Sequence, residues 1–437
     1  MFRSKTASPR PAKLPDVTRS FLVVVLLLAC ASEHERLAST EPPDVEYARD
    51  VEPILRAQCT GCHREGGSAP FALDRYARVA PHAQQIALVT RSGRMPPWPP
   101  ASSDDCPQLI GARGLKEREI ALLEAWAAAG APEGESVDAA ADGGERTRDR
   151  REHGEQAVAE LQHVDAVLQA SEPYLPRPRV DDHRCFPLDP QLPADRYLTA
   201  YAVREEVPGI VHHVQLWAFD DAAAEAELDA LDAAEPGPGY ACPEGVTFDA
   251  RYVSVWAPSD PLRRHPEGTG VLLRGGRRVV VQIHYNDRLA LGLPDRTAIE
   301  LELEESVPLP ARMWTVSNGD IVLPPGEPRR TVRALSGIPA SAPVQLWGVR
   351  PHMHALGSSA RIDVLTGDSV QCLLDVPRWD PAWQLMYFYP QAITLGPADT
   401  LEVECNYDTR GQTETVRYGI RTSDEMCFGF FYVTGGE

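Results

Sequence analysis

The chain has 437 residues, of which 43% are hydrophobic, and this is enough for about two to four domains with real cores. Its formal net charge of −20 opposes binding to phosphate backbones, so nucleic acid is excluded as an expected partner. Forty prolines and 32 glycines indicate many turns and short strands, as in β-rich proteins.

Residues 1–29 predict a signal peptide of the lipoprotein type. Basic residues precede a short apolar core at 21–28, far below the roughly 20 residues of a membrane-spanning helix. Leu27-Leu28-Ala29-Cys30 resembles a bacterial lipobox, so Cys30 is expected to carry the lipid, and residues 30–43 a tether. An ordinary cleaved signal with a chance cysteine is the alternative. Either way we expect an exported, periplasmic or cell-surface lipoprotein of a bacterium, held to the membrane by lipid alone and placed where disulfides persist.

Residues 44–134 show helical spacing of apolar residues around a haem-attachment motif. Cys59-Thr60-Gly61-Cys62-His63 is the C-x-x-C-H signature of covalent haem c, in which both thiols bond the haem and the imidazole is the proximal ligand. Met95 is the expected sixth ligand, because a thioether raises the haem potential and suits electron transfer. His82 is the alternative sixth ligand.

A zinc site or a redox dithiol is the other interpretation of this motif. Two cysteines and one adjacent histidine do not complete a tetrahedral zinc site, and only Cys106 follows in the region. The segment resembles the small all-α cytochrome c domains of bacterial exported oxidoreductases. Residues 135–172 are polar and then densely charged, which predicts a linker with one exposed helix.

From residue 173 the pattern predicts strands joined by Pro/Gly turns, as in β-sandwiches. The segment 277–285 alternates between two faces. The predicted core face carries Val279, Val281, Ile283 and Tyr285, and the opposite face carries Val280, Gln282 and His284.

Five histidines occupy such strand-like segments: His212, His213, His284, His352 and His354. On a strand His352 and His354 share a face, so both can reach one metal. His212 and His213 face opposite ways unless a bulge or twist, prompted by Pro208-Gly209, turns one of them. Taken singly, each histidine also fits a hydrogen-bonded core residue, and imidazole sets suit zinc, copper, iron or nickel equally.

Five ordered motifs between Arg184 and the C-terminus resemble the ascorbate-dependent type II copper monooxygenases, the family of peptidylglycine α-hydroxylating and dopamine β-monooxygenases. They are Val211-His212-His213, Gln282-Ile283-His284-Tyr285, Leu323-Pro324-Pro325-Gly326-Glu327, His352-Met353-His354-Ala355-Leu356-Gly357 and Ser423-Asp424-Glu425-Met426-Cys427. The resemblance implies two jelly-roll sandwich domains, residues 173–304 and 305–437, with two copper ions facing the cleft between them.

The resemblance also implies the site residues. His212, His213 and His284 would hold an electron-transfer copper, and His352, His354 and Met426 the copper that activates oxygen, where a soft thioether favours Cu(I). Disulfides would join Cys185 to Cys242 and Cys405 to Cys427, leaving Cys106 and Cys372 unassigned. Arg350 takes the place of an arginine that grips the substrate carboxylate, but Phe430 replaces the tyrosine that helps it.

The expected reaction is hydroxylation of a C–H bond of a small organic substrate by O2. It needs two electrons from an external reductant, either ascorbate-like or a redox protein, and the fused haem is the candidate donor. Two alternatives are a non-catalytic haem–copper electron-transfer or metal-binding lipoprotein and a zinc-stabilised adhesion or binding module.

Overall fold

The computed structural model describes residues 44–65, 69–96, 100–101, 105–111, 114–134, 161–177, 182–207, 209–242, 250–256, 262–285, 292–381, 384–419, 421 and 423–436. The predicted signal peptide, the tether with Cys30 and the exposed helix expected in the linker lie wholly or mostly outside these residues. None of the helices within the described ranges is both long enough and apolar enough to cross a membrane.

Residues 44–134 fold into helices, as their apolar spacing predicts. The elements are η1 (Tyr47–Val51), α1 (Glu52–Gln58), α2 (Tyr76–Val79), η2 (Ala80–His82), α3 (Ala83–Arg91) and α4 (Glu117–Ala128). Val51 and Leu55 pack with Leu123 and Trp126 in a small core, and all four are at most 1% exposed. The helix α4 begins where the Glu119 carboxylate accepts a 2.7 Å hydrogen bond from the Lys116 amide, which satisfies a donor of the first turn.

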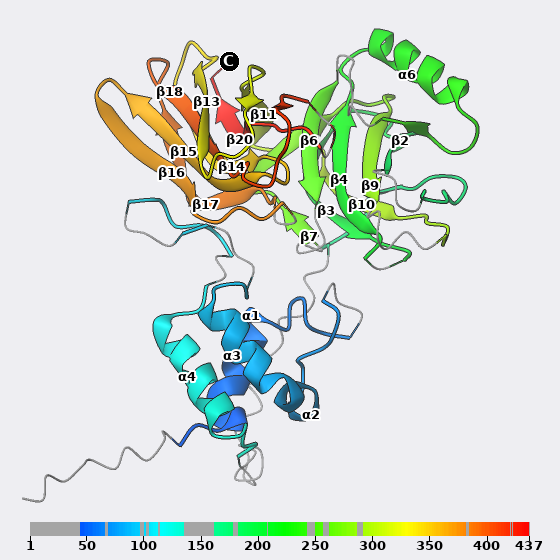
Figure 1. Ribbon diagram of the computed structural model, residues 1–437. Helices are drawn as coiled ribbons and strands as arrows, with labels where there is room; N and C mark the ends of the chain where they lie inside the picture. The colour runs from blue at the N-terminus through cyan, green and yellow to red at the C-terminus, as the bar shows by residue number, and fades with distance from the viewer. Residues whose placement is uncertain are drawn as a thin grey trace, which may run out of the picture. The chain divides into compact units, whose positions relative to one another are not determined.

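The first β-sandwich packs a five-stranded sheet, in the order β5-β2-β9-β4-β6, against one half of a larger sheet (Figure 1). Its elements are β1 (Ala166–Leu168), β2 (Asp182–Leu188), β3 (Arg196–Arg204), β4 (Val211–Ala218), α6 (Ala222–Ala234), β5 (Tyr240–Ala241), β6 (Arg251–Trp256), β7 (Leu262–Arg264), β8 (Thr269–Leu273), β9 (Val279–Tyr285) and β10 (Ala298–Glu304).

The second β-sandwich places a four-stranded sheet, in the order β13-β18-β15-β16, against the other half of that larger sheet. Its strands are β11 (Leu309–Ser317), β12 (Val322–Leu323), β13 (Arg330–Gly337), β14 (Val344–His352), β15 (Gly357–Thr366), β16 (Ser369–Val376), β17 (Tyr387–Leu395), β18 (Thr400–Tyr407), β19 (Val416–Arg417) and β20 (Phe428–Gly435).

One nine-stranded sheet runs through both sandwiches, in the order β1-β10-β3-β8-β11-β20-β14-β17 with β7 paired to β3. The two halves join where β8 and β11 pair in parallel, with Leu309 opposite Thr269 and Ala311 opposite Val271. The sandwiches are therefore not two separate bodies on a hinge, because backbone hydrogen bonds continue from one into the other.

The predicted alternation of β9 is confirmed. Val279, Val281, Ile283 and Tyr285 lie in the core of the first sandwich. On the opposite face Val280 belongs to a satellite core that includes Leu228 of α6, and Gln282 donates to the Cys242 carbonyl at 3.2 Å. The helix α6 was not predicted from the sequence. Its N-cap is Asp221, whose side chain accepts hydrogen bonds from the amides of Ala223 and Ala224.

The first sandwich begins earlier than the expected boundary at residue 173. Strand β1 pairs with β10 in antiparallel register, and the Asp165 carboxylate accepts from the Leu303 amide at 2.7 Å. Ala166–Leu168, expected in the linker, thus belong to the sheet. Their short apolar pattern gave no sign of strand pairing, because the partner lies more than a hundred residues away.

Three disulfides are formed. Cys185–Cys242 and Cys405–Cys427 are the predicted pairs. The third joins Cys106 to Cys372, the two cysteines left unassigned, and so ties the segment between α3 and α4 to β16. Two backbone hydrogen bonds flank it, from Ala101 to the Asp375 carbonyl at 2.8 Å and from Ile110 to the Phe388 carbonyl at 2.7 Å.

A buried histidine near the junction of the sandwiches predicts acid lability. His265 is 7% exposed and donates through Nδ1 to the Leu198 carbonyl at 2.9 Å, and burial lowers its pKa to about 4. Because this pKa lies below the unfolded value of 6.5, the stabilisation is complete above pH 6.5 and is lost as the pH falls towards 4. The loss is up to about 3 kcal/mol.

The side-chain amide of the variant His265→Asn can donate a hydrogen bond as the imidazole does, but it does not titrate. We expect its free energy of unfolding to fall less than that of the wild type between pH 7 and pH 4, as measured by urea denaturation at a series of pH values. Equal losses in the two proteins would show that His265 is not the group responsible.

Candidate metal centres

The first histidine cluster forms where β4 carries one extra residue relative to β9. The register shifts between Val211 and His213, so Val211 pairs with Tyr285 while His213 pairs with His284. This is the bulge that a shared site for His212 and His213 requires. Gly209, just before it, has a φ of 85°, which a glycine adopts readily; Pro208 lies outside the described residues.

The bulge makes three imidazole nitrogens converge. The Nδ1 atoms of His212 and His213 lie 3.2 Å apart, and those of His213 and His284 lie 3.4 Å apart. Nitrogens at this separation, each about 2.0 Å from one ion, subtend roughly 105–120° at it, which suits a trigonal or tetrahedral metal. The predicted set of three histidines therefore fits a metal ion through Nδ1.

A fourth histidine, which the sequence analysis missed, adjoins this cluster. His183 of β2 lies directly opposite His284 in the antiparallel register, and their rings stack with centroids 3.8 Å apart. The ligand atoms of His183, His213 and His284 lie within 4.8 Å of one another. The available signal was the spacing to Cys185, which places both residues on the face of β2 that carries the disulfide.

The second cluster lies at the end of β14. Met353 is fully buried in the core of the second sandwich, so His352 and His354 share the opposite side as predicted, with ring centroids 5.2 Å apart. The His352 Nδ1 donates to the side-chain oxygen of Gln384, whose amide nitrogen donates to the Pro381 carbonyl at 2.8 Å and so fixes the orientation of the amide.

The loop that carries Met426 is bonded to the His354 loop. The His354 Nδ1 donates to the Asp424 carbonyl at 2.9 Å, and the Glu425 carboxylate accepts from the amides of His354 and Leu356 at 2.9 and 2.6 Å. The Met426 carbonyl accepts from the Tyr407 hydroxyl at 2.6 Å. Because Nδ1 carries the proton in His352 and His354, Nε2 would be the ligand atom of each if they bound a metal.

His213 in the first cluster and His352 in the second are held neutral. Burial is the largest cause that moves the pKa of each well below the ordinary value. Neighbouring imidazoles add to it, and so does the charge of Arg350, which acts on both residues. A neutral imidazole is the form that binds a metal, so these two residues are prepared for ligation near neutral pH.

Arg350 lies between the two sandwiches and is 2% exposed. Its guanidinium donates to the Tyr252 hydroxyl of β6 at 2.9 Å and to the Gln384 carbonyl at 2.9 Å, and it lies over the Phe430 ring at 5.0 Å. Tyr252 also stacks on Phe430, with centroids 4.9 Å apart. No carboxylate pairs with Arg350 within the described part of the chain, so its buried charge has only neutral partners there.

The predicted haem motif sits after α1. The His63 Nδ1 donates to the Phe71 carbonyl at 2.9 Å, so Nε2 would be the ligand atom if this residue bound a haem iron. Neither Cys59 nor Cys62 is disulfide-bonded, and burial raises the pKa of Cys59 to about 12. His82 stacks on Phe71 with ring centroids 4.2 Å apart, and the Phe71 ring also contacts His63. Met95 is 37% exposed in the turn after α3.

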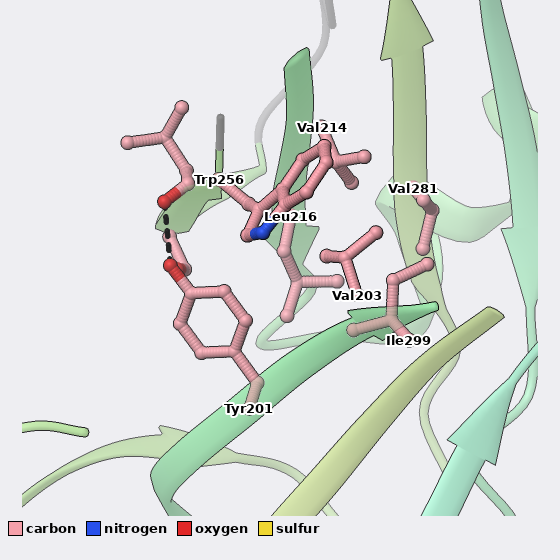
Figure 2. A pocket seen from close by; sticks show the side chains of 9 residues that line it. Tyr201, Val203, Val214, Leu216, Trp256, Val281 and Ile299 are labelled. Atoms are coloured by element: carbon pink, nitrogen blue, oxygen red, sulfur yellow. Dashed lines mark hydrogen bonds between the residues drawn. The ribbon is translucent and has the colours of Figure 1, made fainter. Parts of the chain in front are cut away.

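A cavity of about 10 Å³ lies inside the first sandwich, away from all of these side chains. Figure 2 shows Tyr201, Val214, Leu216 and Trp256 around it. It has room for one water molecule at most and is a packing gap in the core rather than a substrate site.

Comparisons with known proteins agree with the site geometry. Residues 313–434 match the family model described as copper type II ascorbate-dependent monooxygenase, C-terminal domain. Peptidylglycine alpha-amidating monooxygenase of Rattus norvegicus is 31% identical over 205 residues, covering 44% of this chain and 20% of the rat protein.

Two more distant relatives extend the match. Tyramine beta-hydroxylase of Caenorhabditis briggsae is 24% identical over 260 residues, covering 54% of this chain and 42% of that protein. DBH-like monooxygenase protein 1 of Homo sapiens is 24% identical over 245 residues, covering 51% of this chain and 38% of that protein. The chain spans less than half the length of each of these relatives. The comparisons support the copper type II ascorbate-dependent monooxygenase family for the β-rich part of the chain.

Proposed function

We propose that this protein is an exported lipoprotein that hydroxylates a C–H bond of a small organic substrate with O2, using two copper ions and electrons delivered through a c-type haem. The observation that carries the proposal is the pair of histidine clusters, one in each sandwich, with Nδ1 atoms 3.2 and 3.4 Å apart in the first and ring centroids 5.2 Å apart in the second. Copper bound in them would transfer single electrons and activate O2.

The residues of the first cluster have the role of an electron-transfer site. His212, His213 and His284 present Nδ1 atoms from two adjacent strands of one sheet, and the backbone ladder limits their movement. A rigid set of nitrogens suits a centre that changes charge without changing shape.

In the second cluster, His352, His354 and Met426 would be the ligands. The Gln384 side chain and the Asp424 carbonyl orient the two imidazoles, and the Cys405–Cys427 disulfide fixes the residue after Met426. A thioether beside two imidazoles makes this centre softer than the first and favours Cu(I), the form that reacts with O2.

Arg350 is the proposed anchor of an anionic substrate group. A buried guanidinium stays charged, and burying it without a counter-charge is costly. A substrate carboxylate would supply that charge beside His352. The Tyr252 hydroxyl, already bonded to Arg350 at 2.9 Å, stands beside Phe430, where the resemblance leads one to expect a tyrosine hydroxyl.

Covalent haem on Cys59 and Cys62, with His63 and Met95 as axial ligands, is the proposed electron donor. The fixed Nδ1–H of His63 supports this assignment. The Cys106–Cys372 disulfide adds a second covalent tie between the helical segment and the second sandwich. A tethered donor has an effective concentration on the order of millimolar.

The first prediction concerns metal content and oxygen uptake. Protein made with a haem-maturation system should contain one covalent haem and two coppers and should consume O2 with some member of a panel of small amines, peptides and hydrocarbons. Cys59→Ala with Cys62→Ala should abolish the haem and spare the copper. Zinc in both clusters after copper-rich expression would contradict the proposal, and copper without any oxygen uptake would favour the non-catalytic electron carrier.

A second prediction separates the two copper sites. Met426→Ala should weaken Cu(I) binding at the second cluster by roughly tenfold or more and suppress turnover, because thioether loss changes the softness of one site only. Electron acceptance by the first cluster should be unchanged, as measured by anaerobic reductive titration. Unchanged Cu(I) affinity and turnover would remove Met426 from the ligand set.

A third prediction concerns the haem as donor. When the haem of Cu(II)-loaded protein is photoreduced without O2, it should reoxidise in a first-order process whose rate does not depend on protein concentration. Copper-free protein is the control and should retain reduced haem. Equally slow haem oxidation with and without copper would contradict the donor role, and a soluble reductant would then be required.

A further inference from the structure

His183 adds an imidazole from a third strand, β2, to the first cluster. Strands β2, β9 and β4 are neighbours in one sheet, and His183, His284 and His213 face one another in register across it. Side chains paired across adjacent strands point to the same face of a sheet. The common face is the one that carries the Cys185–Cys242 disulfide and the Gln282 side chain rather than the core.

The three convergent Nδ1 atoms leave room for a fourth ligand. Three nitrogens at roughly tetrahedral angles define an open fourth position on the metal. His183 is placed near that position, because its ligand atom lies within 4.8 Å of those of His213 and His284. The ring centroid of His183 is 6.1 Å from that of His213.

We propose that His183 is a fourth copper ligand, so that the first centre is a four-histidine site of His183, His212, His213 and His284. The inference rests on the proposed copper function. A fourth neutral nitrogen donor stabilises Cu(II) more than Cu(I), because the soft Cu(I) ion is satisfied by fewer ligands. His183 therefore lowers the reduction potential of the first centre relative to a three-histidine site.

The stacked arrangement of the His183 and His284 rings must change before both can bind one ion. The rings of His183 and His284 are 14° from parallel, so their nitrogen lone pairs lie in two nearly parallel planes and do not meet at one ion. One of the two rings turns about its side-chain bonds when both bind the same ion. His183 is the one that turns, because the His284 Nδ1 is already directed at the His213 Nδ1.

The competing explanation is that His183 only packs against His284 as an aromatic ring. The two roles respond differently to His183→Phe, which keeps a flat ring for stacking and removes both nitrogens. His183→Gln is a second variant that is polar, smaller and free of imidazole. The matched control is His163→Phe. His163 lies just before β1, and its side chain is 45% exposed.

The experiment uses the full chain carrying His352→Ala and His354→Ala, so that added Cu(II) binds the first cluster alone. Pulsed EPR then counts the coordinated imidazoles, and competition with a chelator gives the Cu(II) and Cu(I) affinities. We expect four imidazoles in this parent and in the His163→Phe control, and three after His183→Phe or His183→Gln. Cu(II) affinity should fall at least about tenfold in both His183 variants, with Cu(I) affinity little changed. A tenfold selective loss of Cu(II) corresponds to a potential about 59 mV higher.

Three imidazoles in the parent, with spectrum and affinity unchanged by His183→Phe, would show that His183 only stacks and would overturn this inference while leaving the copper function intact. A parent that binds no copper at the cluster would overturn both.

Discussion

The parallel pairing of β8 with β11 is the constraint on which the arrangement of both candidate centres depends. It makes one sheet continuous through the two sandwiches, so β14 and β20 keep a defined orientation relative to the strands of the first sandwich. The contact between Arg350 of β14 and Tyr252 of β6 follows from that orientation. If a flexible connection alone joined the two sandwiches, this contact would have to form again each time the sandwiches met, at an entropic cost.

Burial affects the histidines and the arginine of the site in opposite ways. It keeps His213 and His352 neutral, because a protonated imidazole would lose its hydration, and neutrality is what a metal ligand needs. The guanidinium of Arg350 cannot lose its proton in the same way, so its charge persists. The same desolvation therefore prepares the histidines for a cation and Arg350 for an anion, in one region of the fold.

The predictable part of the site was local in sequence. Period-two alternation gave the two faces of β9 and the common side of His352 and His354, and the adjacent histidines implied a bulge in β4. Features that depend on pairing between distant segments were missed. His183 becomes a candidate ligand only because it lies opposite His284. In the same way, β1 is a strand because it pairs with β10, and Cys106 forms a disulfide because the fold brings Cys372 beside it. Spacing along one strand shows which residues share a face, as for His183 and Cys185, but it does not show which distant strand pairs with it.

The Cys106–Cys372 disulfide links the expected compartment to the proposed electron path. Its two cysteines are 266 residues apart, and it ties the segment after Met95 to β16 of the sandwich that contains His352 and His354. A single connection through the chain would leave the helical segment a large volume to explore, and a second tie reduces that volume. Such a bond persists only where thiols are oxidised, so the proposed export would preserve a tie that would keep the proposed haem donor near its acceptor.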